Sequence, residues 1–172
     1  LDSAAWSTAG LTLSLLVLRW IEAGVGADYV EAHWSLGLNA AIWLGLALAQ
    51  LQRTKGNATG LLNKLRWALA ALFTLLGGGA LLGALTAVNP LLAGGVSNHV
   101  FGPILVNTLA AAYLLPALVL LGGAWQLDRI DPRLRLALGG AGAALAVFWA
   151  FTAIRHFWQG GAQMPLAQGI SQ

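Results

Sequence analysis

The chain has 172 residues, of which 58% are hydrophobic and only 9% charged, and its mean hydropathy is +0.74. About a quarter of the residues of a soluble domain are charged, and the apolar residues here run in long blocks, so the composition excludes a water-soluble fold. The net charge of +3 does not indicate nucleic-acid binding, because most basic residues lie in two short segments. The chain contains no cysteine, which excludes disulfides, thiolate metal sites and cysteine nucleophiles.

The apolar blocks predict an all-α fold, a polytopic transmembrane helix bundle with five spans. Asp28 and Glu31 fit a capping box at the start of the second span, and Pro90 is expected to stop the third. Pro103 suits the start of the fourth, which crosses Pro116. The expected spans cover about residues 4–24, 29–52, 61–88, 103–127 and 133–158.

Residues 1–172 are expected to form one transmembrane region, because no soluble insert is long enough for a second domain. A chain that begins with Leu1 instead of Met, and with no cleavable leader before it, is interpreted as an excerpt of a longer multi-spanning chain.

The basic residues predict the orientation of the spans. Those in and around two turns are Arg53, Lys55, Lys64, Arg66, Arg129, Arg133 and Arg135. Positively charged loops stay in the cytoplasm, so Leu1 is expected inside and Gln172 outside. Other ionisable residues are then expected to gather at the outward side: Arg19, Glu22, Asp28, Glu31, His33, His99, Arg155 and His156.

Two interpretations of this outward polar cluster remain open. Arg155 can extend to the lipid headgroups, or it can turn inward and pair with an acid of the first two spans, Glu22 or Glu31. Arg19 lies three residues before Glu22 and can pair with it locally. The three histidines and a carboxylate could hold zinc, but they are far apart in sequence, so no metal site and no cofactor are expected.

Small and polar residues within the spans indicate helix packing. In the second span small residues recur every four positions, which favours close approach of another helix: Gly37, Ala41, Gly45 and Ala49. Asn39 and Asn107 are expected to hydrogen-bond to neighbouring helices. Pro116 frees the carbonyl group of Ala112, so a kink there could shape a cavity lined by Tyr113 and Asn107.

The second half of the chain resembles a known family. The residues that carry the resemblance are Asn89-Pro90, Asn107, Tyr113-Leu114-Leu115-Pro116-Ala117, Ile154-Arg155, Phe157 and Gly160. They are similar to a bacterial family of uncharacterised many-spanning membrane proteins, the domain of unknown function numbered twenty-three thirty-nine, best over residues 85–161. The resemblance implies a bacterial inner-membrane location and a longer parent chain, and it brings no catalytic residue because the family has no agreed activity.

Three classes of function follow. The first, a non-catalytic helical bundle that is a structural or assembly part of a larger membrane protein, is favoured because no phosphate-binding loop, nucleophile elbow or metal signature occurs. The second is a transporter or channel segment. The third is an outward-facing enzyme for a lipid-linked substrate, with His156, His99 or Glu31 as acid or base and Arg155 holding an anionic group. The expected partners are the lipid bilayer and other transmembrane helices, not nucleic acid.

Overall fold

The computed structural model describes residues 2–54, 60–92, 94–95, 98–103, 105–127, 131–159 and 164–166, without the side chains of residues 2 and 3. This part of the chain is helical and contains no strand. Its elements are α1 (Asp2–Gly24), the 3₁₀ helix η1 (Ala27–Tyr29), α2 (His33–Thr54), α3 (Leu61–Leu85), the π-helix η3 (Ala110–Leu114), α4 (Leu115–Gln126) and α5 (Pro132–Gln159). The predicted all-α fold is confirmed.

Four of the described helices are long and apolar enough to cross a membrane, namely α1, α2, α3 and α5. The remaining apolar helix, Ala110–Gln126, combines η3 with α4 and is shorter. The prediction of several apolar membrane-crossing helices is therefore confirmed, with the fourth predicted span the shortest of the five helices.

The predicted start of the second span is wrong. Asp28 lies in η1 and Glu31 in the following turn, whereas α2 begins at His33. Gly26, with a φ of 133°, turns the chain after α1, and the Val30 amide then closes the short helix on the Ala27 carbonyl. Asp28 and Glu31 therefore form no capping box with α2.

The boundaries around the long connection also differ from the prediction. Helix α3 ends at Leu85, because Asn89 folds back: its Nδ2 donates to the Leu85 carbonyl at 2.8 Å, and its Oδ1 accepts from the Leu91 amide at 2.9 Å. The next helix does not start at Pro103. Helical structure resumes at Thr108, where the side chain of Asn107 caps the Ala110 amide at 3.1 Å.

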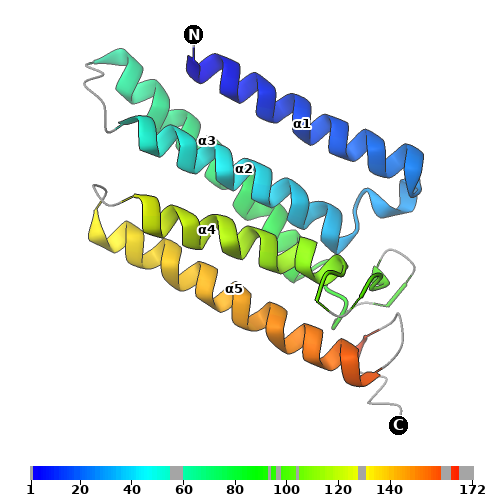
Figure 1. Cartoon of the computed structure of the whole chain (residues 1–172). Coiled ribbons are helices and arrows are strands. Elements are labelled where there is room, and N and C mark those ends of the chain that lie inside the picture. Colours follow the sequence, from blue (N-terminus) through cyan, green and yellow to red (C-terminus); the bar gives the residue numbers. More distant parts are fainter. Residues whose placement is uncertain are drawn as a thin grey trace.

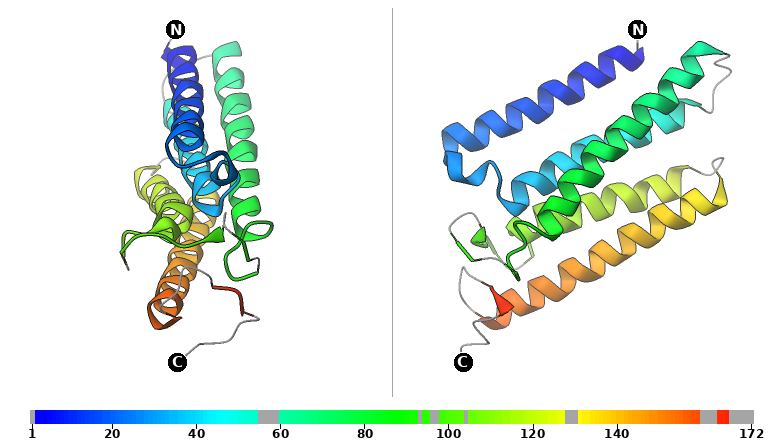
Figure 2. Two further views of the ribbon diagram at one scale, coloured as in Figure 1. Left: turned by 90° about the vertical axis from the view of Figure 1, so that its right-hand side faces the viewer. Right: turned by 180° about the vertical axis from the view of Figure 1, so that it is seen from behind.

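Four helices lie side by side in one row, in the order α1, α2, α4, α5, and α3 packs against α2 behind this row (Figures 1 and 2). Helices α1 and α5 therefore form opposite edges of an open layer (Figure 1). Each edge helix is mostly exposed. Of the apolar stretch that could cross a membrane, only 17% is buried in α1 and 22% in α5.

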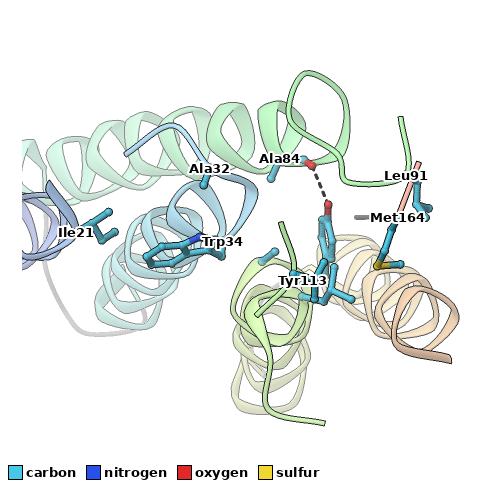
Figure 3. Packing of buried hydrophobic residues seen from close by; sticks show 10 residues of the cluster. Ile21, Ala32, Trp34, Ala84, Leu91, Tyr113 and Met164 are labelled. Carbon is cyan, nitrogen blue, oxygen red and sulfur yellow. Dashed lines mark hydrogen bonds between the residues drawn. The ribbon is translucent and has the colours of Figure 1, made fainter. Parts of the chain in front are cut away.

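The largest buried cluster lies where the row meets the α3–α4 connection (Figure 3). It joins the described helices to residues from that connection and from the segment after α5: Ile21, Ala32, Trp34, Ala84, Leu91, Val100, Leu109, Ala112, Tyr113 and Met164. The Leu166 amide donates to the Leu91 carbonyl at 2.9 Å, which ties the segment after α5 to the connection. This cluster fixes the end of the molecule where the predicted outward polar residues lie.

Candidate functional site

The two ends of the row differ in character. One end, here called the basic end, carries Arg53 at the end of α2, Lys64 and Arg66 at the start of α3, and Arg133 and Arg135 at the start of α5. The other, here called the loop end, consists of the α1–α2 turn, the α3–α4 connection and the end of α5 (Figure 1). All eight residues of the predicted outward polar cluster lie at the loop end, but they are spread along the row.

The acidic residues of the loop end gather on the α1 edge. Arg19 donates to Glu22 at 3.2 Å, and both side chains are exposed, by 81% and 50%. Together with Asp28 and Glu31 they line an open hollow of about 760 Å³. An exposed pair of this kind contributes little to stability.

Arg155 lies at the other edge of the row, on α5. The expected ion pair with Glu22 or Glu31 is not formed, and the hypothesis of that pair is wrong. The Nη2 of Arg155 instead points to the Pro165 carbonyl oxygen at 3.4 Å, next to the segment that follows α5. The reason is the open row: α2 and α4 lie between the helix that carries Arg155 and the helix that carries Glu22.

The three histidines occupy separate places at the loop end. His33 is fully buried at the start of α2, with its Nε2 3.2 Å from the Thr108 hydroxyl. The ring of His99 lies 5.8 Å from that of Phe101 in the α3–α4 connection, and His156 is half-buried on α5. Within the described ranges no three His, Asp or Glu side chains lie close enough together to hold a metal ion.

The two asparagines of the spans have different positions. Asn39 is buried in α2, and its Oδ1 accepts a hydrogen bond from the Ser14 hydroxyl of α1. This bond joins the edge helix to its neighbour, while the Nδ2 of Asn39 donates to the Ser35 carbonyl at 3.0 Å. Asn107 lies just before the fourth helix and caps it, so its expected position inside a span is wrong.

Pro116 follows the π-helix η3 in a closely packed part of the described structure. The Leu115 amide donates to the Ala110 carbonyl, a bond that spans one residue more than in an α-helix. Pro116 has no amide to offer the Ala112 carbonyl and its ring would crowd that group, so a wider turn relieves the contact. Ala112 and Pro116 are both buried, and Gly37 of α2 packs directly against the turn.

Tyr113 projects from this same turn and is fully buried. Its hydroxyl donates to the Ala84 carbonyl near the end of α3 at 2.9 Å, as the dashed line in Figure 3 shows. Its ring stands perpendicular to that of Phe148 on α5, with the centroids 4.9 Å apart. One side chain of η3 therefore contacts both α3 and α5.

The small-residue stripe of α2 faces α4 and is tight at one end only. A β-carbon on Gly37 would lie 2.3 Å from the Ala112 Cα, and Ala41 is buried. A β-carbon on Gly45 would meet nothing within 4 Å. Gly45 and Ala49 instead line a hollow of about 310 Å³ between α2 and α4, so the expected close approach does not extend to them.

Sequence reasoning missed several polar residues that the fold uses. Ser14 and Thr108 are small hydroxyl residues with no distinctive spacing, and only their bonds to Asn39 and His33 single them out. Gln50 is fully buried near the end of α2. The signal that could have singled out Gln50 is a glutamine within an apolar run. It lies near the basic end, not near the loop end.

Comparison with known proteins identifies the family but no activity. No curated protein and no solved structure matches the chain. The family model described as Predicted membrane protein (DUF2339) matches residues 2–169, far more than the best part of the resemblance found in the sequence. The chain therefore belongs to this family of predicted membrane proteins.

Proposed function

We propose that this chain is a non-catalytic helix bundle that serves as a structural or assembly part of a larger membrane protein or complex. The observation that carries the proposal is that polar side chains inside the bundle hold its helices in place. Ser14 with Asn39 joins α1 to α2, Tyr113 joins η3 to α3, and Asn107 caps a helix. The first two contacts fix the relative positions of helices and the third fixes where a helix begins, which is what a scaffold requires.

The open row supports the same proposal. Its edge helices α1 and α5 expose large apolar side chains, among them Leu16 at 61% and Ile154 at 60%. Such faces can be covered by lipid or by further helices. A part of a larger assembly would place further helices on at least one edge.

The two alternatives have weaker support. A transport path was expected near Asn107, Tyr113 and Pro116, but these residues take part in capping and packing. An enzyme would need converging acid or base groups, and His33, His99 and His156 occupy separate places along the loop end.

The proposed location is a bacterial inner membrane, with the basic end in the cytoplasm and the loop end outside. In this orientation Leu1 is cytoplasmic and Gln172 outward. The support is the positive charge of the basic end, since Lys and Arg near span ends remain on the cytoplasmic side.

Photocrosslinking in native membranes tests the assembly role. A photoreactive phenylalanine analogue would replace Leu16 on α1 or Ile154 on α5, with the buried position Ala40 as control. We expect adducts at an edge position that contain a defined transmembrane peptide from outside this bundle, identified by mass spectrometry. Adducts with lipid alone at both edges would contradict the assembly role.

A further inference from the structure

The basic end holds a pair of arginines on neighbouring helices. The Nη1 of Arg66 on α3 donates to the main-chain carbonyl of Arg53, at the end of α2, at 2.6 Å. The guanidinium carbon of Arg53 lies 5.6 Å from the ring centre of Trp6 on α1. Three helices therefore meet around two cationic side chains, each of which is only partly buried.

No described carboxylate balances these charges. The ion pair among the described residues is Arg19 with Glu22, at the loop end. Lys64 adds another positive charge in the first turn of α3. Helix α3 begins here after Gly60, which provides no side-chain cap, so its first amides add the positive end of the helix dipole. The local field therefore favours an anion.

Unpartnered polar atoms gather at the same place. The donors Arg53 Nη1, Arg66 Nε and Gln50 Nε2 are buried and form no hydrogen bond within the described part of the chain. The acceptors Asn63 Oδ1 and Gln50 Oε1 are also unpaired there, but a phosphate would not bond to them. Gln50 is completely buried, one helical turn before Arg53. Buried polar groups in folded proteins are nearly always bonded, so several unpaired donors at one place indicate a missing acceptor.

The surroundings of the two arginines are apolar. Trp6 of α1 is exposed, and so are Leu62, Leu65 and Trp67 in the first turns of α3. An anion bound at this end would therefore lie beside exposed hydrocarbon. This combination suits an amphiphile with an anionic head better than a fully soluble ion.

We propose that Arg53 and Arg66 form a binding site for the phosphate group of an anionic phospholipid at the basic end of the bundle. Guanidinium groups bind phosphate oxygens through charge-assisted, often bidentate hydrogen bonds. The amides of the first turn of α3 add to the field around the phosphate. The acyl chains lie along the exposed leucines of α3.

Native mass spectrometry of the protein in neutral maltoside micelles tests the site. The probes are phosphatidylglycerol, zwitterionic phosphatidylcholine and inorganic phosphate, each titrated separately. The variants are Arg66→Gln and Arg53→Gln, and the matched control is Arg133→Gln, which removes one exposed charge from the start of α5 at the same end of the bundle. Arg53→Gln keeps the main-chain carbonyl that accepts from Arg66, so this contact between α2 and α3 remains in that variant. If Arg66→Gln unfolds the protein, Arg53→Gln still tests the site.

We expect phosphatidylglycerol to bind more tightly than phosphatidylcholine. Each arginine variant should weaken phosphatidylglycerol binding by about tenfold or more, since one charge-assisted hydrogen bond is lost, while the control should change it by less than about threefold. Phosphate that binds as well as the lipid, and is lost in the same variants, would support the anion site but assign it to a soluble phosphate. Equal binding of the two lipids, or arginine variants that bind phosphatidylglycerol as the control does, would overturn the proposal.

Discussion

Gly37 of α2 faces the main chain of Ala112 so closely that a β-carbon at position 37 would lie 2.5 Å from the Ala112 carbonyl oxygen. This is the carbonyl that Pro116 leaves without its usual helical donor. The widened turn of η3 therefore meets α2 at the position where α2 has no side chain. Two departures from a regular helix, a proline and a glycine, are matched across one interface.

Gly37→Ala should therefore destabilise the bundle. The new methyl group would collide with main-chain atoms, which cannot rotate away, and we expect a loss of about 1–3 kcal/mol or more in the free energy of unfolding. Gly45→Ala is the matched control on the same helix, because a β-carbon there meets nothing within 4 Å. It should be neutral or stabilising by up to about 1 kcal/mol. Unfolding in mixed micelles, followed by circular dichroism, measures both, and equal stability of the two variants would contradict the close contact.

Tyr113→Phe removes only the hydrogen bond between η3 and α3. The ring contact with Phe148 is kept, whereas the Ala84 carbonyl loses its donor. We expect a loss of about 0.6–2 kcal/mol, the range for hydrogen bonds between membrane helices. Tyr29→Phe is the control, since it removes a hydroxyl from a partly exposed ring in η1 and keeps the contact of that ring with Phe101. A Tyr113 variant as stable as the Tyr29 variant would show that the bond contributes nothing.

The helices themselves were predictable from the sequence because each is a long apolar block, and hydropathy alone locates such blocks. Their ends were not. The start of α2 depends on the φ of Gly26, and the end of α3 on the side chain of Asn89 folding back. Both depend on local geometry that Asp28-x-x-Glu31 and Asn89-Pro90 do not specify.

The candidate site was predictable only in part, for a related reason. Charge asymmetry predicted that the ionisable residues share one end, and the fold places them there. Which of them meet depends on the order of the helices in the row, and hydropathy carries no information on that order. Arg155 and Glu22 were therefore paired in expectation although they lie on opposite edges.

Ser14 and Asn39 should be energetically coupled, because their hydrogen bond is the buried polar contact between α1 and α2. In a double-mutant cycle with Ser14→Ala and Asn39→Ala, we expect a coupling of about 0.6 kcal/mol, and up to about 1.7 kcal/mol. Thr12→Ala is a suitable control on α1, since the Thr12 hydroxyl donates only to the Thr8 carbonyl of its own helix. A cycle of Thr12→Ala with Asn39→Ala should give no coupling, and the same value in both cycles would refute the specific contact.

Arg155→Ala should change stability by less than about 1 kcal/mol. Removal of a buried ion-pair partner strands the remaining charge and costs about 3–5 kcal/mol, but Arg155 pairs with no carboxylate among the described residues. Its contact with the Pro165 carbonyl, at 3.4 Å, is long for a hydrogen bond. The measurement is again unfolding in mixed micelles, with Arg19→Ala as the control for an exposed arginine. A loss above about 3 kcal/mol for Arg155→Ala alone would mean that an acid does pair with it in the membrane.

The orientation of the chain can be tested by cysteine labelling, because the natural sequence has no cysteine to interfere. Thr54→Cys lies at the basic end, after Arg53, and Ser97→Cys lies in the long connection after α3. If the basic end is cytoplasmic, a membrane-impermeant maleimide added to intact cells should label position 97 and leave position 54 unlabelled until the cells are lysed. A second variant, Gln52→Cys, lies near the same end of α2 and should behave like Thr54→Cys. It shows whether labelling depends on this end of the helix or on one position alone. Labelling of positions 52 and 54 but not 97 in intact cells would reverse the orientation and place the phosphate site on the outer surface.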